Sequence, residues 1–89
     1  VNTFVPPLKG MTREEAESKI VDAFLNPGAI IYDMTVEDEE DSLSAMIFRQ
    51  SPVYSEGLKL PMGSFIDIWL TVDSLKVFEE LNIEEEDEI

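Results

Sequence analysis

The chain has 89 residues, of which 44% are hydrophobic, and its 20 acidic and 6 basic residues give a net charge of −14. A chain this short holds one hydrophobic core at most, and its share of hydrophobic residues is typical of a folded domain. The negative charge excludes nucleic acid and anionic membrane surfaces as partners of this fragment, because both would be repelled.

The sequence contains no cysteine and no histidine. It therefore lacks disulfides, thiolate metal ligands and the side chain that most often serves as a general base or metal ligand. No nucleophile stands beside a base, so the composition predicts a protein that is not an enzyme and has no catalytic residue, cofactor or metal site. The chain begins at Val1 instead of methionine, and we expect it to be a piece of a longer protein.

The first predicted element is a helix that begins at Thr12, after an extended, proline-containing segment over residues 4–8. Thr12 and Glu15 have the spacing of a capping box, in which each side chain accepts a hydrogen bond from the other residue's backbone amide. Apolar residues follow at helical spacing, namely Ala16, Ile20, Ala23 and Phe24. The Asn-Pro-Gly sequence at residues 26–28 predicts the end of the helix.

Three strands are predicted after the helix, over residues 29–36, 45–50 and 65–72. Ser51 and Pro52 close the second strand, because proline ends strand pairing. The third strand has the firmest pattern, since it alternates apolar positions (Ile66, Ile68, Leu70 and Val72) with a mixed set (Phe65, Asp67, Trp69 and Thr71).

Loops are predicted over residues 37–41, which are all acidic, and over residues 56–64, which contain two glycines and a proline. The acidic runs at residues 37–41 and 84–88 lack the alternating ligands and the glycine of an EF-hand, so they predict a solvated surface rather than a calcium site. The whole pattern predicts an α+β fold with one α-helix packed on a three-stranded antiparallel β-sheet. This domain covers residues 1–73, and an acidic tail that can form a short helix covers residues 74–89.

Three motifs stand in the order and spacing of a known family. Residues 5–16 read Val-Pro-Pro-Leu-Lys-Gly-Met-Thr-Arg-Glu-Glu-Ala, residues 47–52 read Ile-Phe-Arg-Gln-Ser-Pro, and Gly63 precedes the third strand. In these motifs the chain resembles the PASTA domains, which occur as repeats on the outer segments of bacterial serine/threonine kinases and penicillin-binding proteins. It departs from the family at Ala45, where the family carries glycine, and in the turn at residues 53–57.

The resemblance implies a non-catalytic, extracytoplasmic module that binds peptidoglycan fragments (muropeptides) in a cell-wall sensing or cell-wall synthesis protein. The parent would be anchored in the membrane, with neighbouring PASTA-like domains beside this one. The alternative is a structural spacer or protein-interaction module without a small ligand, whose acidic tail contacts a basic partner.

Four residues are candidates for ligand binding: Arg49, Gln50, Phe65 and Trp69. Phe65 and Trp69 lie on one face of the third strand and would offer a stacking platform for a sugar ring, unless the tail or the loops of Lys9 and Lys59 cover them. Arg49 would clamp a carboxylate or serve as an internal counter-charge. Gln50 matches a recurring glutamine of the family, and its amide would otherwise bond the backbone of the adjacent loop.

Overall fold

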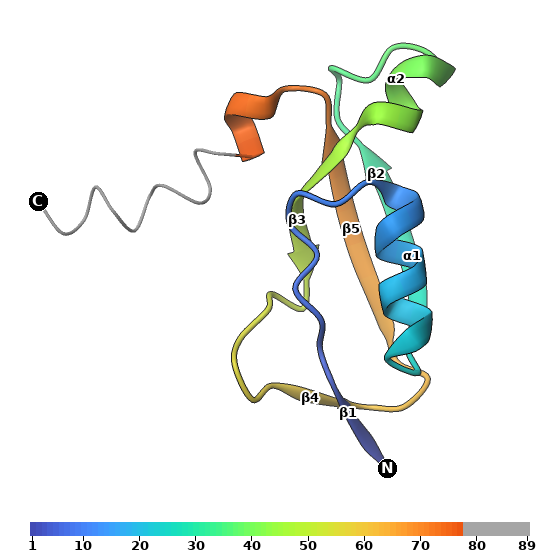
Figure 1. Ribbon diagram of the computed structural model, residues 1–89, viewed down its shortest axis with the longest axis vertical. Coiled ribbons are helices and arrows are strands. Elements are labelled where there is room, and N and C mark those ends of the chain that lie inside the picture. Colours follow the sequence, from blue (N-terminus) through green and yellow to red (C-terminus); the bar gives the residue numbers. More distant parts are fainter. Residues whose placement is uncertain (78–89) are drawn as a thin grey trace, which may run out of the picture.

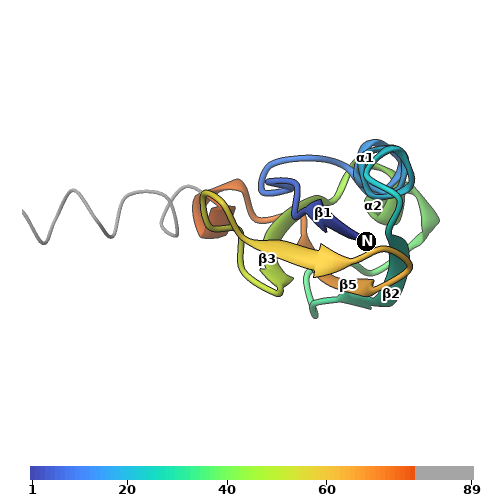
Figure 2. The same cartoon turned by 90° about the horizontal axis from the view of Figure 1, so that it is seen from below.

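The computed structural model describes residues 1–77, which form an α+β fold with two sheets (Figure 1). Its elements are, in chain order, β1 (Asn2–Phe4), α1 (Arg13–Asp22), β2 (Asn26–Tyr32), α2 (Glu39–Ser44), β3 (Met46–Ser51), β4 (Lys59–Pro61) and β5 (Phe65–Thr71). The larger sheet has the strand order β2-β5-β3, and the smaller sheet pairs β1 with β4. Seen from below, α1 and the N-terminal segment lie on the same side of the larger sheet (Figure 2).

The predicted start of α1 is confirmed. Thr12 is the N-cap residue, its hydroxyl accepts from the Glu15 amide at 3.3 Å, and the Glu15 carboxylate accepts from the Thr12 amide at 3.0 Å. These two bonds satisfy amides that have no partner inside the helix. The helix that begins after this cap buries Ala16 and Ile20 completely against the sheet.

The predicted end of α1 was wrong, because the helix stops at Asp22, before residues 26–28. Phe24 adopts a left-handed backbone with φ of 62°, and its N–H donates to the Val21 carbonyl. The Leu25 N–H donates back to the Ile20 carbonyl at 3.0 Å, and both side chains are buried. This is the Schellman arrangement, in which the reversal usually falls on glycine.

We expect Phe24→Gly to stabilise the protein relative to Phe24→Ala by about 1 kcal/mol, because only glycine adopts the left-handed region without a steric cost. The Phe24 side chain is 65% exposed, so its removal costs little in either variant. Urea unfolding of the two variants measures the difference. Equal stability of the glycine and alanine variants would show that this position carries no backbone strain.

The larger sheet is mixed, and the prediction of an all-antiparallel sheet was wrong in this respect. β5 pairs antiparallel with β3 but parallel with β2. β5 is the central strand because it pairs with both β2 and β3, and its side chains Ile66, Ile68 and Leu70 are all completely buried. β2 and β3 become the edges, and an edge tolerates Pro27 inside β2, since proline cannot donate to a second neighbour.

The core lies between α1, the N-terminal segment and the inner face of the larger sheet, as the predicted helix-on-sheet packing requires. It consists of Val5, Leu8, Ala16, Ile20, Leu25, Ala45, Ile47, Ile66, Ile68 and Leu70. The predicted alternation of the third strand is confirmed from Phe65, which is exposed, to Leu70. It ends there, because Thr71 is buried while Val72 is exposed.

Both predicted loops contain regular structure. The acidic residues 39–41 form the first turn of α2, and the side chain of its N-cap residue Asp38 accepts from the Asp41 amide at 2.8 Å. Carboxylates suit this position, because the first turn of a helix presents unpaired amides and the positive end of the dipole. Residues 56–64 include β4, which pairs with β1. The first predicted strand is also displaced, since β2 begins at Asn26 and ends at Tyr32.

Candidate functional site

The structure separates Gln50 from the other candidate residues. Gln50 is only 2% exposed, and its side-chain oxygen accepts from the Leu8 amide at 2.8 Å. Its side-chain nitrogen donates to the carbonyls of Pro6 and Pro52 at 3.1 and 3.2 Å. Both amide hydrogens and the carbonyl are thus engaged by backbone. The side chain joins the N-terminal segment to the end of β3 instead of facing solvent.

A bulge in β3 determines which way Arg49 and Gln50 point. The pairing with β5 shifts between Ile47 and Arg49, so Phe48 is an additional residue in the ladder. Simple alternation from buried Ile47 would turn Arg49 inward and Gln50 outward. Because the bulge inserts one residue, Arg49 faces outward and Gln50 faces the core. The run of apolar residues that predicted this strand does not indicate the bulge.

Arg49 and Trp69, two of the four candidate ligand-binding residues, form a pair on the outer face of the sheet. They are directly opposite in the β3–β5 register, and the Arg49 guanidinium carbon lies 5.0 Å from the centre of the Trp69 ring. Ile31 of β2 flanks Trp69 on its other side. Arg49 is exposed and Trp69 half-buried, so a cation, an aromatic ring and an aliphatic side chain form one row across the outer face of the sheet.

Phe65 is on the same face but is not part of this row. It lies at the start of β5, opposite Asn26, and is 65% exposed. Four residues along a strand correspond to about 13 Å, so Phe65 and Trp69 do not form one continuous platform. Asp67 stands between them, and its carboxylate accepts from the Ala29 amide at 2.8 Å. The described residues leave Phe65 open, and the Lys59 ammonium lies over Phe4, 4.7 Å from the ring centre.

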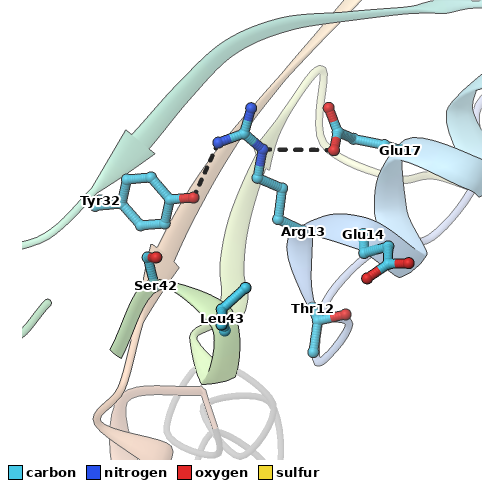
Figure 3. A pocket seen from close by; sticks show the side chains of 7 residues that line it. All are labelled: Thr12, Arg13, Glu14, Glu17, Tyr32, Ser42 and Leu43. Carbon is cyan, nitrogen blue, oxygen red and sulfur yellow. Dashed lines mark hydrogen bonds and ion pairs between the residues drawn. The ribbon is translucent and has the colours of Figure 1, made fainter. Parts of the chain in front are cut away.

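A cleft of about 340 Å³ between α1 and α2 was missed by the sequence analysis, because α2 was predicted as a loop (Figure 3). Arg13 crosses it, donating to the Tyr32 hydroxyl at 3.0 Å and pairing with Glu17 at 3.4 Å. The cleft is also lined by Thr12, Glu14, Ser42 and Leu43. Two carboxylates against one guanidinium make this a negatively charged opening, suited to basic groups rather than to acids.

A hydrogen-bond network holds the end of β2 to the end of β5. The Asp33 carboxylate accepts from the Thr35 amide at 3.0 Å, from the Thr35 hydroxyl and from the Lys76 ammonium at 3.0 Å. The Thr35 hydroxyl lies 3.1 Å from that of Thr71 and accepts from the Val72 amide at 3.0 Å. The Lys76 ammonium also lies 4.1 Å from the centre of the Phe48 ring. Residues 74–77 are therefore tied to the sheet.

Asp33 titrates well below its ordinary range. Burial raises the pKa of its carboxyl group, but the hydrogen bonds from Thr35, Thr71 and Lys76 together lower this pKa to about 2. The charged form is therefore favoured in the folded protein. This carboxylate is engaged by donors of its own chain, which makes it a structural group.

We expect Asp33→Asn to lower the free energy of unfolding at pH 7 by on the order of 1 kcal/mol. Because the pKa of Asp33 is lower in the folded than in the unfolded chain, its contribution is complete above about pH 4 and is lost as the pH falls through about 2. Urea unfolding between pH 2 and pH 7 should show the two proteins converging at low pH. The control is Asp22→Asn, at the exposed end of α1. A constant difference at every pH would exclude this linkage.

Within residues 1–77, no helix has the length and apolar composition needed to cross a bilayer. The same residues hold no group of three or more carboxylates placed to bind a metal ion. Searches against protein-family models, curated proteins and solved structures each find no match to the chain. The relationship to the PASTA domains therefore stays a prediction from the three sequence motifs.

Proposed function

We propose that the chain is a PASTA-like, non-catalytic module outside the cytoplasm that binds peptidoglycan fragments in a cell-wall sensing or cell-wall synthesis protein. The ordered motifs at residues 5–16 and 47–52 and at Gly63 support the family. In this proposal the parent protein is anchored in the membrane and carries neighbouring PASTA-like domains, and the module uses neither cofactor nor metal.

The observation that carries the binding proposal is the stacking of Arg49 on Trp69, on the outer face of the larger sheet. Muropeptides combine sugar rings with carboxylate-bearing peptides. An indole face packs against a sugar ring, and a guanidinium pairs with a carboxylate through two parallel hydrogen bonds. The row of Ile31, Trp69 and Arg49 offers both kinds of contact within one sheet register.

Binding on this surface would be weak. Arg49 and Ile31 are exposed and Trp69 is half-buried, so a ligand on this row stays largely in contact with water. The chain's net charge of −14 also opposes an acidic ligand and leaves Arg49 as the local attraction. We therefore expect dissociation constants near the millimolar range.

Titration of muropeptides into the labelled protein, followed by amide NMR, tests the proposal. We expect shifts in β3, β5 and the end of β2, and their loss in Arg49→Gln and Trp69→Leu. Phe24→Leu is the control, because it alters an exposed aromatic residue that follows α1 and is not part of the row. Absence of shifts at millimolar ligand, or unchanged shifts in both site variants, would reject ligand binding at this surface.

The second candidate is a spacer or protein-interaction module without a small ligand, whose acidic tail contacts a basic partner. The charges favour it, because the cleft lined by Glu14 and Glu17 lies beside the acidic helix α2. A pull-down with the full chain and with a chain lacking residues 78–89 would test the tail, since this truncation leaves Lys76 in place. Unchanged partners after truncation would rule out the tail as the contact.

A further inference from the structure

The strand β2 leaves one of its two edges without a partner strand in the part of the chain that the structure describes. The larger sheet has the order β2-β5-β3, so β2 pairs only with β5 and lies at the right-hand edge of this sheet in Figure 1. The outer edge of β3 is instead covered near its start, because Ile47 exchanges backbone hydrogen bonds with Gly10 and Met11. An open edge presents backbone groups that can pair with a further strand.

The backbone groups of Ile30 and Tyr32 point away from β5. The Asp33 amide donates to the Leu70 carbonyl at 2.9 Å, which directs the Asp33 backbone toward β5. Successive residues of a strand direct their backbone groups to opposite sides, so those of Ile31 face β5 and those of Ile30 and Tyr32 face the open edge. Each of these two residues thus offers one amide and one carbonyl to an added strand.

This part of β2 lacks the features that usually prevent an edge from pairing. Proteins protect their sheet edges with charged side chains, prolines or bulges. Pro27 and the register shift that follows it interrupt the first half of β2, but residues 29–32 read Ala-Ile-Ile-Tyr and carry no charge. β-Branched and aromatic residues also favour an extended backbone. The open edge is therefore the short stretch around Ile31.

The charges beside this edge select the kind of strand that fits it. Tyr32 packs on the inner face and lines the cleft together with Glu14 and Glu17 (Figure 3). Arg13 pairs with Glu17, whereas the Glu14 carboxylate has no ion-pair or hydrogen-bond partner among residues 1–77. On the outer face, the neighbouring side chain is the exposed Ile31. An added strand therefore meets carboxylates on its inner side and an aliphatic side chain on its outer side.

We infer that the open edge of β2 binds an extended, basic segment of a partner protein as an added antiparallel strand. Residues of that segment opposite Ile30 and Tyr32 would exchange backbone hydrogen bonds with them. Their side chains would point to the inner face, where lysine or arginine reaches the cleft carboxylates, and the residue between them would be aliphatic and pack beside Ile31. Two copies of the chain, each with a net charge of −14, would repel one another, which favours a basic partner over a second copy.

This site differs from the muropeptide surface in its ligand and in its use of backbone groups. It rests on the second candidate function, protein interaction, but assigns the basic partner to the sheet edge instead of the acidic tail.

The test titrates the full chain with the peptide acetyl-Thr-Lys-Val-Lys-Thr-amide and follows amide NMR shifts and hydrogen exchange. We expect the peptide to shift residues 29–33 and to slow the exchange of the Ile30 and Tyr32 amides, which should exchange fast without it. N-methylation of both lysines should weaken binding about tenfold, because it removes the donors to β2 without changing the charge. N-methylation of the valine is the matched control, since its amide points away from β2.

Two variants test the contribution of the cleft. Glu14→Lys should weaken the peptide about fivefold, because it places a positive charge beside the peptide's lysines. Glu56→Lys, the same charge change in the segment between β3 and β4, should have little effect. Equal weakening by the two variants would contradict the inference, because only net charge would then matter.

The inference is also overturned if the peptide leaves residues 29–33 unshifted at about 5 mM, a weak-binding limit. Shifts confined to residues 78–89 would overturn it in favour of the tail, and equal affinities of the two N-methylated peptides would exclude strand pairing. Slow exchange of the Ile30 and Tyr32 amides in the free chain would show that the edge is already covered, by a second copy if this protection depends on protein concentration. Arg49→Gln should leave peptide binding intact, so the result is independent of the muropeptide titration.

Discussion

Replacement of Gln50 by alanine should lower the free energy of unfolding by about 2–4 kcal/mol. The side chain is buried and makes three hydrogen bonds, to the Leu8 amide and to the carbonyls of Pro6 and Pro52. Its removal leaves the buried Leu8 amide without its partner and opens a cavity. An unsatisfied buried donor costs more than the bond itself contributed, because its hydration is not recovered.

Urea unfolding at pH 7 measures this loss, and Arg49→Ala is the control in the same strand. We expect that variant to lose less than about 1 kcal/mol, because its side chain is exposed and contributes mainly the contact with Trp69. Gln50→Glu should also be destabilised at pH 7, since a carboxylate cannot donate to the two proline carbonyls. If Gln50→Ala loses no more than Arg49→Ala, the amide is not the tie between the N-terminal segment and β3.

The second large effect is expected for Ile68→Ala, which should cost about 3–4 kcal/mol. Ile68 is completely buried in the central strand, opposite Ile30 of β2 and Gln50 of β3. Both neighbouring strands are held by their own ladders to β5, so they cannot move in to fill the space of the lost side chain. A domain of this size has only a few kcal/mol of stability, so this variant should be close to unfolded at 37 °C.

Thermal and urea unfolding measure the effect, and Ile68→Val provides the graded control at about 1 kcal/mol. The exposed position Phe65 in the same strand supplies a second control, because Phe65→Ala removes more atoms from a site with little burial. A smaller loss for Ile68→Ala than for Phe65→Ala would contradict the assignment of the inner and outer faces of β5.

The Arg49–Trp69 row depends on the fold through one local feature, the bulge at Phe48, which turns Arg49 outward.

Features that depend on neighbouring residues along the chain were predictable. The start of α1 follows from Thr12 and Glu15, whose side chains bond each other's amides within one turn. The inner face of β5 follows from Ile66, Ile68 and Leu70, because alternate residues of a strand point to the same side. The α+β class then follows, since one apolar helix stripe and one apolar sheet face bury each other.

The errors occurred where a local preference competes with contacts that are distant in sequence. Residues 26–28 contain proline and glycine and suggest a stop, yet they belong to β2, where Gly28 leaves room for the Asp67 carboxylate and the Ile66 backbone. The repulsion among the acids of residues 37–41 suggested a loop, but the Asp38 carboxylate caps α2 and the next three acids form its first turn. The parallel pairing of β2 with β5 has no signature in either strand, because it arises from the order of the strands in the sheet.

The candidate site shows the same division. The sequence identified one cationic residue, Arg49, and two aromatic residues, Phe65 and Trp69, on the predicted strands. The alternation of the third predicted strand placed both aromatic residues on the same face of the sheet. Whether Arg49 or Gln50 faces that surface was decided by the β3 bulge, because one additional residue reverses the inward and outward positions that follow it. Composition and short-range spacing thus determined most of the helices and strands and the types of side chain available for binding. Strand order, the bulge and burial decided which of these side chains lie next to each other. The sequence alone did not determine those three features, because they depend on contacts between residues far apart in the chain.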